Sequence, residues 1–257
     1  MNKKIVSLSL IVTIISIFYI TFNNQPSQIE QPLTIGIAAG YAPYISINAE
    51  GQYEGFDIDV ASILADKLNK KIELKDLGSM TPLMIALDQG SIDMIIWGLS
   101  ITQERLNKMA MVHYTGKNTK TNPLAFWQGV PENFKTLDDA KDLIISVEPS
   151  SFQASVLAHY PKINILTTEK VDDALLNIQY GKSDAAFLDP DIAKKFRAKY
   201  PEIQLVDVPL KENEETLGIG MAIKKDNEQL INEITLAIDE LKKDGSLKAL
   251  ELKWNMQ

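Results

Sequence analysis

The pattern of apolar and polar positions predicts an α/β fold that begins at residue 33. Residues 33–37 alternate like a half-buried strand, and apolar residues then recur with helical spacing from Phe56 to Leu68. Thr81 and Pro82 have the form of an N-cap followed by proline at the first helical position, and Gly90 the form of a C-cap. A helix is therefore predicted over 82–89, and short strands over 72–74 and 94–97.

The same order of elements recurs in the second half of the chain. Strands are predicted over 143–147 and 185–188, and a helix over 171–180. The turn from helix to strand has the same spacing twice, as Leu87-x-x-Gly90-x-x-Asp93 and as Ile178-x-x-Gly181-x-x-Asp184. Two similarly built lobes are therefore predicted, each a mostly parallel sheet flanked by helices.

A strand and a long helix remain after the second lobe. Residues 217–223 have a strand pattern, and the apolar positions of 230–241 lie on one face of a helix that Gly245 ends. Both are explained if the chain crosses back to complete the first lobe. The predicted domains are an export segment (1–27), the first part of lobe 1 (28–118), lobe 2 (119–213) and the second part of lobe 1 (214–257).

The first residues have the pattern of an export signal. Lys3 and Lys4 precede an uncharged apolar run over 5–22, and a polar linker with two prolines follows over 23–32. No small-x-small cleavage site follows the run, so both a cleaved signal peptide and a retained membrane anchor remain open. Either one predicts a periplasmic protein.

Composition narrows the classes of function. The formal charge of -8 disfavours nucleic acid and anionic lipid as partners and favours a soluble small molecule. The sequence has no cysteine, which excludes disulfides, thiol nucleophiles and thiolate metal sites. Its two histidines, His113 and His159, lack the spacing of metal ligands or of a catalytic pair. We therefore predict no catalysis, no metal and no cofactor.

Ligands of open α/β sheets bind beyond the carboxyl ends of the strands, where loops and helix N-termini converge. Segments 38–44 and 97–105 of the first lobe, and 148–152 with Asp189 of the second, occupy such positions. A cleft between the lobes would bring all four together.

Arg105 is the first candidate binding residue. It lies three positions after the capping residue Thr102, on a first helical turn where the helix dipole disfavours a cation. The chain has only two arginines against 24 lysines, and arginine offers the planar fork that grips a carboxylate. A surface arginine paired with a nearby carboxylate is the alternative. Arg197 is predicted to lie on a solvated helix face.

Asp189 is the second candidate. It ends a buried strand, where it can receive an ammonium group, and with Pro190 it also has the form of an ordinary N-cap; both interpretations can hold together. Other residues near strand ends have equally plain alternatives. The aromatic side chains of Tyr41, Tyr44 and Trp97 can stack on a ligand or belong to the core. Met80 can form the floor of a pocket or only pack against its neighbours. Glu148 can face the cleft or the solvent.

These segments resemble the polar amino-acid-binding family of extracellular solute-binding proteins that serve ABC transporters. The matching motifs span residues 33–254: Gly40-Tyr41-Ala42-Pro43-Tyr44, Gly55-Phe56-Asp57-Ile58-Asp59-Val60-Ala61, Ala86-Leu87-x-x-Gly90-x-x-Asp93, Ser100-Ile101-Thr102-x-x-Arg105, Gly181-x-x-Asp184-Ala185-Ala186-x-x-Asp189, and Asp244-Gly245-Ser246-Leu247 with Lys253-Trp254. Each is weak alone, and together they are specific.

The resemblance implies a role for individual residues. Arg105 would clamp an α-carboxylate together with the Ser100 hydroxyl and N–H groups around Gly98 and Ser151, and Asp189 would hold the α-ammonium. Tyr41 would cover the ligand, with Met80 opposite and Trp97 beside the ligand's side chain. The loop Pro149-Ser150-Ser151-Phe152, where Ser150 and Ser151 are the predicted binding residues, departs from the family's glycine before threonine or serine.

The resemblance thus implies the substrate-binding component of an amino-acid ABC transporter, a monomer whose membrane partner is the permease. Hinge strands near 117–124 and 210–217 would let the lobes close on a free L-amino acid like a flytrap. Tyr41, Trp97 and the acidic balance lean toward a basic ligand such as arginine. Two alternatives stay open: a periplasmic dehydratase of the cyclohexadienyl or arogenate type with Glu148 as general acid, and a tethered amino-acid sensor.

Overall fold

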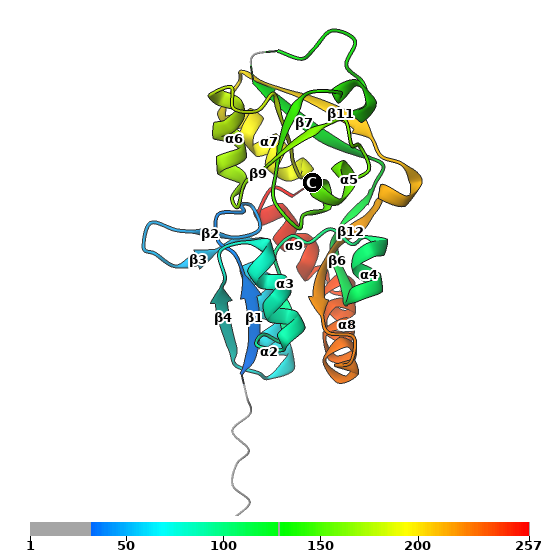
Figure 1. Cartoon of the computed structure of the whole chain (residues 1–257). Helices are drawn as coiled ribbons and strands as arrows, with labels where there is room; N and C mark the ends of the chain where they lie inside the picture. Colours follow the sequence, from blue (N-terminus) through cyan, green and yellow to red (C-terminus); the bar gives the residue numbers. More distant parts are fainter. Residues whose placement is uncertain (1–31, 128, 257) are drawn as a thin grey trace, which may run out of the picture. The chain divides into compact units, whose positions relative to one another are not determined.

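Two five-stranded sheets form the framework of the computed structural model, which describes residues 32–127 and 129–256. Figure 1 shows the path of the chain through them. The strands of the first sheet, in spatial order, are β4 (Ile72–Asp76), β1 (Leu33–Ile37), β5 (Met94–Ile95), β12 (Thr216–Ile223) and β6 (Ala110–Thr119). Those of the second are β11 (Ile203–Pro209), β7 (Thr121–Trp127), β10 (Ala185–Phe187), β8 (Ile144–Val147) and β9 (Asn164–Thr167). A small hairpin pairs β2 (Ser46–Ile47) with β3 (Tyr53–Glu54).

Helices pack on both sheets. The first sheet is accompanied by α2 (Phe56–Leu68), α3 (Met80–Gln89), α4 (Gln103–Lys108), α8 (Glu228–Lys243) and α9 (Ser246–Lys253). The second is accompanied by α5 (Phe152–Leu157), α6 (Val171–Gln179), α7 (Pro190–Lys199) and the 3-10 turn η1 (Leu137–Ala140). A second 3-10 turn, η2 (Glu212–Glu214), lies between β11 and β12. The predicted fold class is confirmed.

Each sheet has a parallel part and an antiparallel part. β1 pairs in parallel with β4 and β5, and β8 pairs in parallel with β9 and β10. The antiparallel pairs involve the strands next to the two crossings between sheets: β6 leads into β7, and β11 leads through η2 into β12. β12 therefore returns the chain to the first sheet after the second is complete.

The repeated spacing noted in the sequence has one structural cause. The Asp93 carboxylate accepts the Thr34 N–H at 2.7 Å, and the Asp184 carboxylate accepts the Ile144 N–H at the same distance. In each pair the aspartate N–H also donates back to the partner strand's carbonyl oxygen at 2.8 Å. Both aspartates fix the start of one strand beside its parallel neighbour, so the motif is structural and the two sheets are built alike.

The cores follow strand alternation. Leu124 and Phe126 of β7 belong to the hydrophobic cluster on one face of the second sheet, whereas Ala125 belongs to the cluster on the other face. Tyr41 packs against the core of the first sheet and also against the α6–α7 cluster of the second. This one side chain therefore joins the two hydrophobic interiors.

The predicted start of the helix after the second strand is wrong by two residues. α3 begins at Met80 with Ser79 as N-cap, and not at Pro82 with Thr81 as N-cap. Proline lacks an N–H, but none of the first-turn amides of a helix has an intrahelical acceptor, so proline is tolerated at the third position as well as the first. The earlier start places Met80 at the helix end that approaches Arg105.

The predicted export segment (1–27) lies outside the described residues. Within residues 32–127 and 129–256, no helix combines the length and apolar character needed to cross a bilayer.

Candidate functional site

An inner cavity of about 20 Å³ lies where loops from both sheets meet. It is lined by Tyr41, Met80, Trp97, Gly98, Leu99, Ser100, Arg105, Glu148, Ser151, Phe152, Gln153 and Asp189. All the predicted site residues except Ser150 are in this set. Ser150 lies at its edge, where its backbone carbonyl accepts a hydrogen bond from Arg105 at 3.4 Å.

Arg105 is a buried cation, only 8% exposed. The predicted cap is present, because the Thr102 hydroxyl accepts the Arg105 N–H at 3.1 Å and begins α4. The guanidinium donates to the Ser100 carbonyl at 2.8 Å and approaches the Met80 sulfur at 4.0 Å. Burial lowers the pKa of Arg105 to about 10. No carboxylate of the described residues lies within ion-pair distance, so the predicted alternative of a surface ion pair does not hold.

Asp189 faces the same cavity and is 7% exposed. Its carboxylate accepts the Asp191 N–H at 3.2 Å and caps α7, with Pro190 at the first helical position as predicted. Burial, and then the neighbouring charge of Asp191, raise the pKa of Asp189 to about 7. Asp191 differs, since it accepts the Tyr44 hydroxyl at 3.1 Å and lies 4.0 Å from Lys194. The cap and the cavity interpretations of Asp189 are therefore compatible.

Glu148 is a cavity residue that the predicted site omitted. The sequence favoured a solvated loop position, whereas the structure places it half-buried, lining both the inner cavity and a second, more enclosed void of about 10 Å³ between Tyr41 and residues of β8, α6 and β10. Burial, followed by the charges of Asp189 and Glu169, raises the pKa of Glu148 to about 8. The described residues provide its carboxylate with neither a hydrogen bond nor an ion pair.

Aromatic side chains cover one side of the cavity. The Tyr41 ring lies 5.0 Å from that of Trp97 and 5.9 Å from that of Tyr44, measured between centroids. The Trp97 indole N–H is buried and has no acceptor among the described residues. A bound molecule with an acceptor atom would satisfy this donor.

Two of the contacts implied by the resemblance are taken up within the protein. The Gly98 N–H donates to the buried Asp57 carboxylate at 2.8 Å, which also accepts the Tyr114 hydroxyl at 2.6 Å. The Ser151 N–H donates to the Glu148 carbonyl at 3.4 Å. The Ser151 hydroxyl donates to the same carbonyl at 2.6 Å and caps α5 by accepting the Ala154 N–H. These groups shape the loops around the cavity and are not free anion donors.

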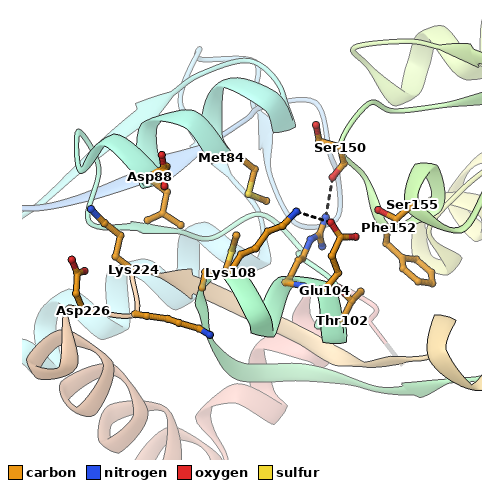
Figure 2. Close-up of a pocket in the computed structure, with 14 residues that line it drawn as sticks. Met84, Asp88, Thr102, Glu104, Lys108, Ser150, Phe152, Ser155, Lys224 and Asp226 are labelled. Carbon is orange, nitrogen blue, oxygen red and sulfur yellow. Dashed lines mark hydrogen bonds and ion pairs between the residues drawn. The ribbon is translucent and has the colours of Figure 1, made fainter. Parts of the chain in front are cut away.

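A larger outer pocket of about 740 Å³ adjoins the inner cavity, and Arg105 and Phe152 line both. Figure 2 shows Met84 and Asp88 on α3, Lys108 and Glu104 on α4, and Ser150, Phe152 and Ser155 from the second sheet's side. Thr81 of α3 also approaches Ser150, with 3.1 Å between their hydroxyl oxygens. The guanidinium of Arg105 therefore lies between the outer pocket and the inner cavity.

Sequence reasoning also missed Gln153, and it gave no role to Phe152 although it placed segment 148–152 at the cleft. Both lie on the first turn of α5 and are buried. Ser151 as N-cap was the available signal, since the residues after a cap at a strand end face the same cleft. In the described part of the chain, no three His, Cys, Asp or Glu side chains group closely enough to hold a metal ion.

Sequence comparison identifies relatives along most of the chain. The family model for bacterial extracellular solute-binding proteins, family 3, matches residues 33–257. The probable ABC transporter arginine-binding protein ArtJ of Chlamydia trachomatis serovar D is 31% identical over 222 residues, covering 86% of this chain and 85% of the relative.

Comparison with solved structures also identifies similar binding proteins. The P235GK mutant of ArgBP from T. maritima superposes with a TM-score of 0.78 at 26% identity, covering 88% of this chain and 95% of that one. An ancestral amino acid-binding protein, a precursor of cyclohexadienyl dehydratase, gives 0.74 at 27% identity, covering 87% and 95%. This chain therefore belongs to the bacterial extracellular solute-binding proteins, family 3.

Proposed function

We propose that this protein binds a basic L-amino acid between two lobes, without catalysis, and presents it to the permease of an ABC transporter. The proposed lobes are 28–118 with 214–257, and 119–213, preceded by a signal peptide or anchor over 1–27. Two sheets, with β12 returning to the first, support this division. The arginine-binding relatives support the ligand class.

The balance of charges in the inner cavity carries the proposal. The guanidinium of Arg105 and the carboxyl groups of Asp189 and Glu148 line the same cavity. None of these three groups has an ion-pair partner among the described residues. Buried charges are costly unless they are paired. A molecule with one carboxylate and two cationic groups complements this set, and a basic amino acid has that charge pattern.

In this proposal, each predicted site residue has a role in ligand binding. Arg105 grips the α-carboxylate with two donors, and Asp189 accepts the α-ammonium. Tyr41 and Trp97 provide ring faces beside a cationic side chain, and Met80 packs against Arg105. Gly98, Ser100, Ser150 and Ser151 form the loops that hold these groups in place.

Binding requires movement of the lobes. The inner cavity of about 20 Å³ has room for about one water molecule, so an amino acid enters only when the loops around it separate. The crossings near 117–124 and 210–217 are the proposed hinges. Ligand contacts made only when the lobes are together would shift the population toward closure.

Calorimetry with the twenty amino acids tests the proposal. The protein lacking residues 1–31 should bind arginine, lysine or histidine with a Kd of micromolar or below, alanine far more weakly, and glutamate not detectably. Glutamate is the informative control because it reverses the side-chain charge. Tightest binding of an acidic amino acid, or no binding of any amino acid, would contradict the proposed function.

A dehydratase is a second candidate because one observation favours it. The raised pKa of Glu148 keeps this carboxyl protonated at neutral pH when no cation is nearby, as a general acid requires. Incubation with prephenate and arogenate, followed by detection of the aromatic product, tests this activity. Turnover abolished in Glu148→Gln would establish it; no turnover would exclude it for these substrates.

A further inference from the structure

Glu148 lies where it can distinguish ligands by the charge of their side chains. Arg105 and Asp189 together can satisfy the α-carboxylate and α-ammonium that every amino acid carries. Glu148 is then left without a partner, and it lines both the inner cavity and the more enclosed void between Tyr41 and the second sheet. A group that reached Glu148 would therefore belong to the variable part of the ligand.

The surroundings of Glu148 argue against a purely structural role. Its backbone carbonyl fixes the loop by accepting from the Ser151 hydroxyl at 2.6 Å, but the side-chain carboxylate makes no hydrogen bond or ion pair within the described residues. The void beyond it is lined by the apolar side chains of Val147, Val171 and Phe187 among others, together with Ser151, Gln153 and Asp189, and no cation is among its lining residues. A carboxylate in such a place lowers the stability of the ligand-free protein, and a cation brought by the ligand would relieve that cost.

We propose that Glu148 is the specificity-determining residue that selects a ligand with a positively charged side chain. The inference rests on the proposed function, since it assumes that Arg105 and Asp189 hold the α-groups. The inference adds Glu148 to the proposed binding residues and gives a physical reason for the preference for a basic ligand. Glu148 pairs with the guanidinium or ammonium at the end of the ligand, and a neutral side chain of the same shape leaves the carboxylate unpaired.

Arginine and citrulline form the decisive ligand pair, because citrulline keeps the shape of arginine and loses its charge. The variant Glu148→Gln keeps the side chain's size and removes its charge. We expect the preference for arginine over citrulline to fall about tenfold to a hundredfold, the value of one charge-assisted contact. Citrulline affinity should stay within about threefold of wild type.

Glu169→Gln is the matched control. Glu169 is exposed and acts on Glu148 through its charge, but it does not line the cavity. This variant removes the same formal charge nearby and should keep the wild-type preference. Thermal unfolding should show that Glu148→Gln folds, with a ligand-free Tm at or above that of wild type.

The outcomes separate the two proposals. If Glu148→Gln keeps the full preference for arginine, or if Glu169→Gln loses as much, Glu148 does not select the charge, although amino-acid binding stands. If wild type binds no amino acid at all, the proposed function and this inference both fail. Loss of preference in Glu148→Gln alone, with citrulline binding intact, establishes the assignment.

Discussion

At the residue scale, the chemistry of the site depends on a few side chains placed without partners. A buried charge normally has a partner, yet Arg105, Asp189 and Glu148 share one cavity with no ion pair among the described residues. The pKa values of the two carboxyls rise and that of Arg105 falls, which are the directions that burial produces. A ligand with charges of the opposite signs would therefore supply the partners that these three groups lack.

Arg105 can be tested against the other arginine of the chain. Arg105→Ala should weaken binding of arginine about 100-fold or more, because the α-carboxylate would lose its partner in a buried site. Arg105→Lys keeps the charge but not the planar fork, and should lose on the order of tenfold. Arg197→Ala, at an exposed position, should bind like wild type. Calorimetry measures all three, and wild-type affinity in Arg105→Ala would refute its role.

At the element scale, the loops are held by caps and by one tight turn. Thr102 begins α4, Asp189 begins α7 and Ser151 begins α5, so three helix starts point residues at the cavity. Gly98 follows β5 with a φ of 54°, and an added Cβ would lie 2.8 Å from the Tyr44 ring. The turn therefore needs glycine for its conformation and for its space.

Gly98→Ala should lower the free energy of unfolding by about 2 to 4 kcal/mol, from left-handed backbone strain together with overpacking. Gly181→Ala is the control, since Gly181 has a φ of 67° but open space around it, and it should cost only about 1 kcal/mol. Urea unfolding of both variants measures the difference. Equal losses would mean that the Tyr44 contact does not constrain this turn.

At the scale of the whole molecule, the site consists of five segments from two sheets, so its protonation depends on the assembled fold. In the unfolded chain, Asp189 and Glu148 would have pKa values near 4, whereas in the folded protein these values are about 7 and about 8. At pH values between the unfolded and the folded pKa values, the folded protein binds more protons than the unfolded chain. The free energy of unfolding without ligand should therefore fall as pH rises from about 5 to about 8.

Binding of a cationic ligand should show the opposite dependence. The ligand stabilises the charged carboxylates and releases their protons, so affinity for arginine should rise over the same pH range. Calorimetry in two buffers of different ionisation enthalpy measures the release directly. Affinity that falls as pH rises would contradict the proposed pairing. The charges that act on the two carboxyls are those of Glu169, Asp191 and Lys194 and of each other, and Arg105 lines the same cavity.

The sequence by itself determined most of the elements, the two-sheet architecture and most of the cavity's residues, because caps, strand ends and periodicity are local signals, but it did not indicate β9 or β11. It also indicated the return of the chain to the first sheet. Only the tertiary structure decided the environment of particular groups. Glu148 resembles a solvated loop glutamate until β8, α6 and Asp189 surround it, and the Gly98 N–H resembles a free donor until Asp57 accepts it. Burial and charge pairing depend on residues distant in the chain, so their energies are set only when the two sheets meet.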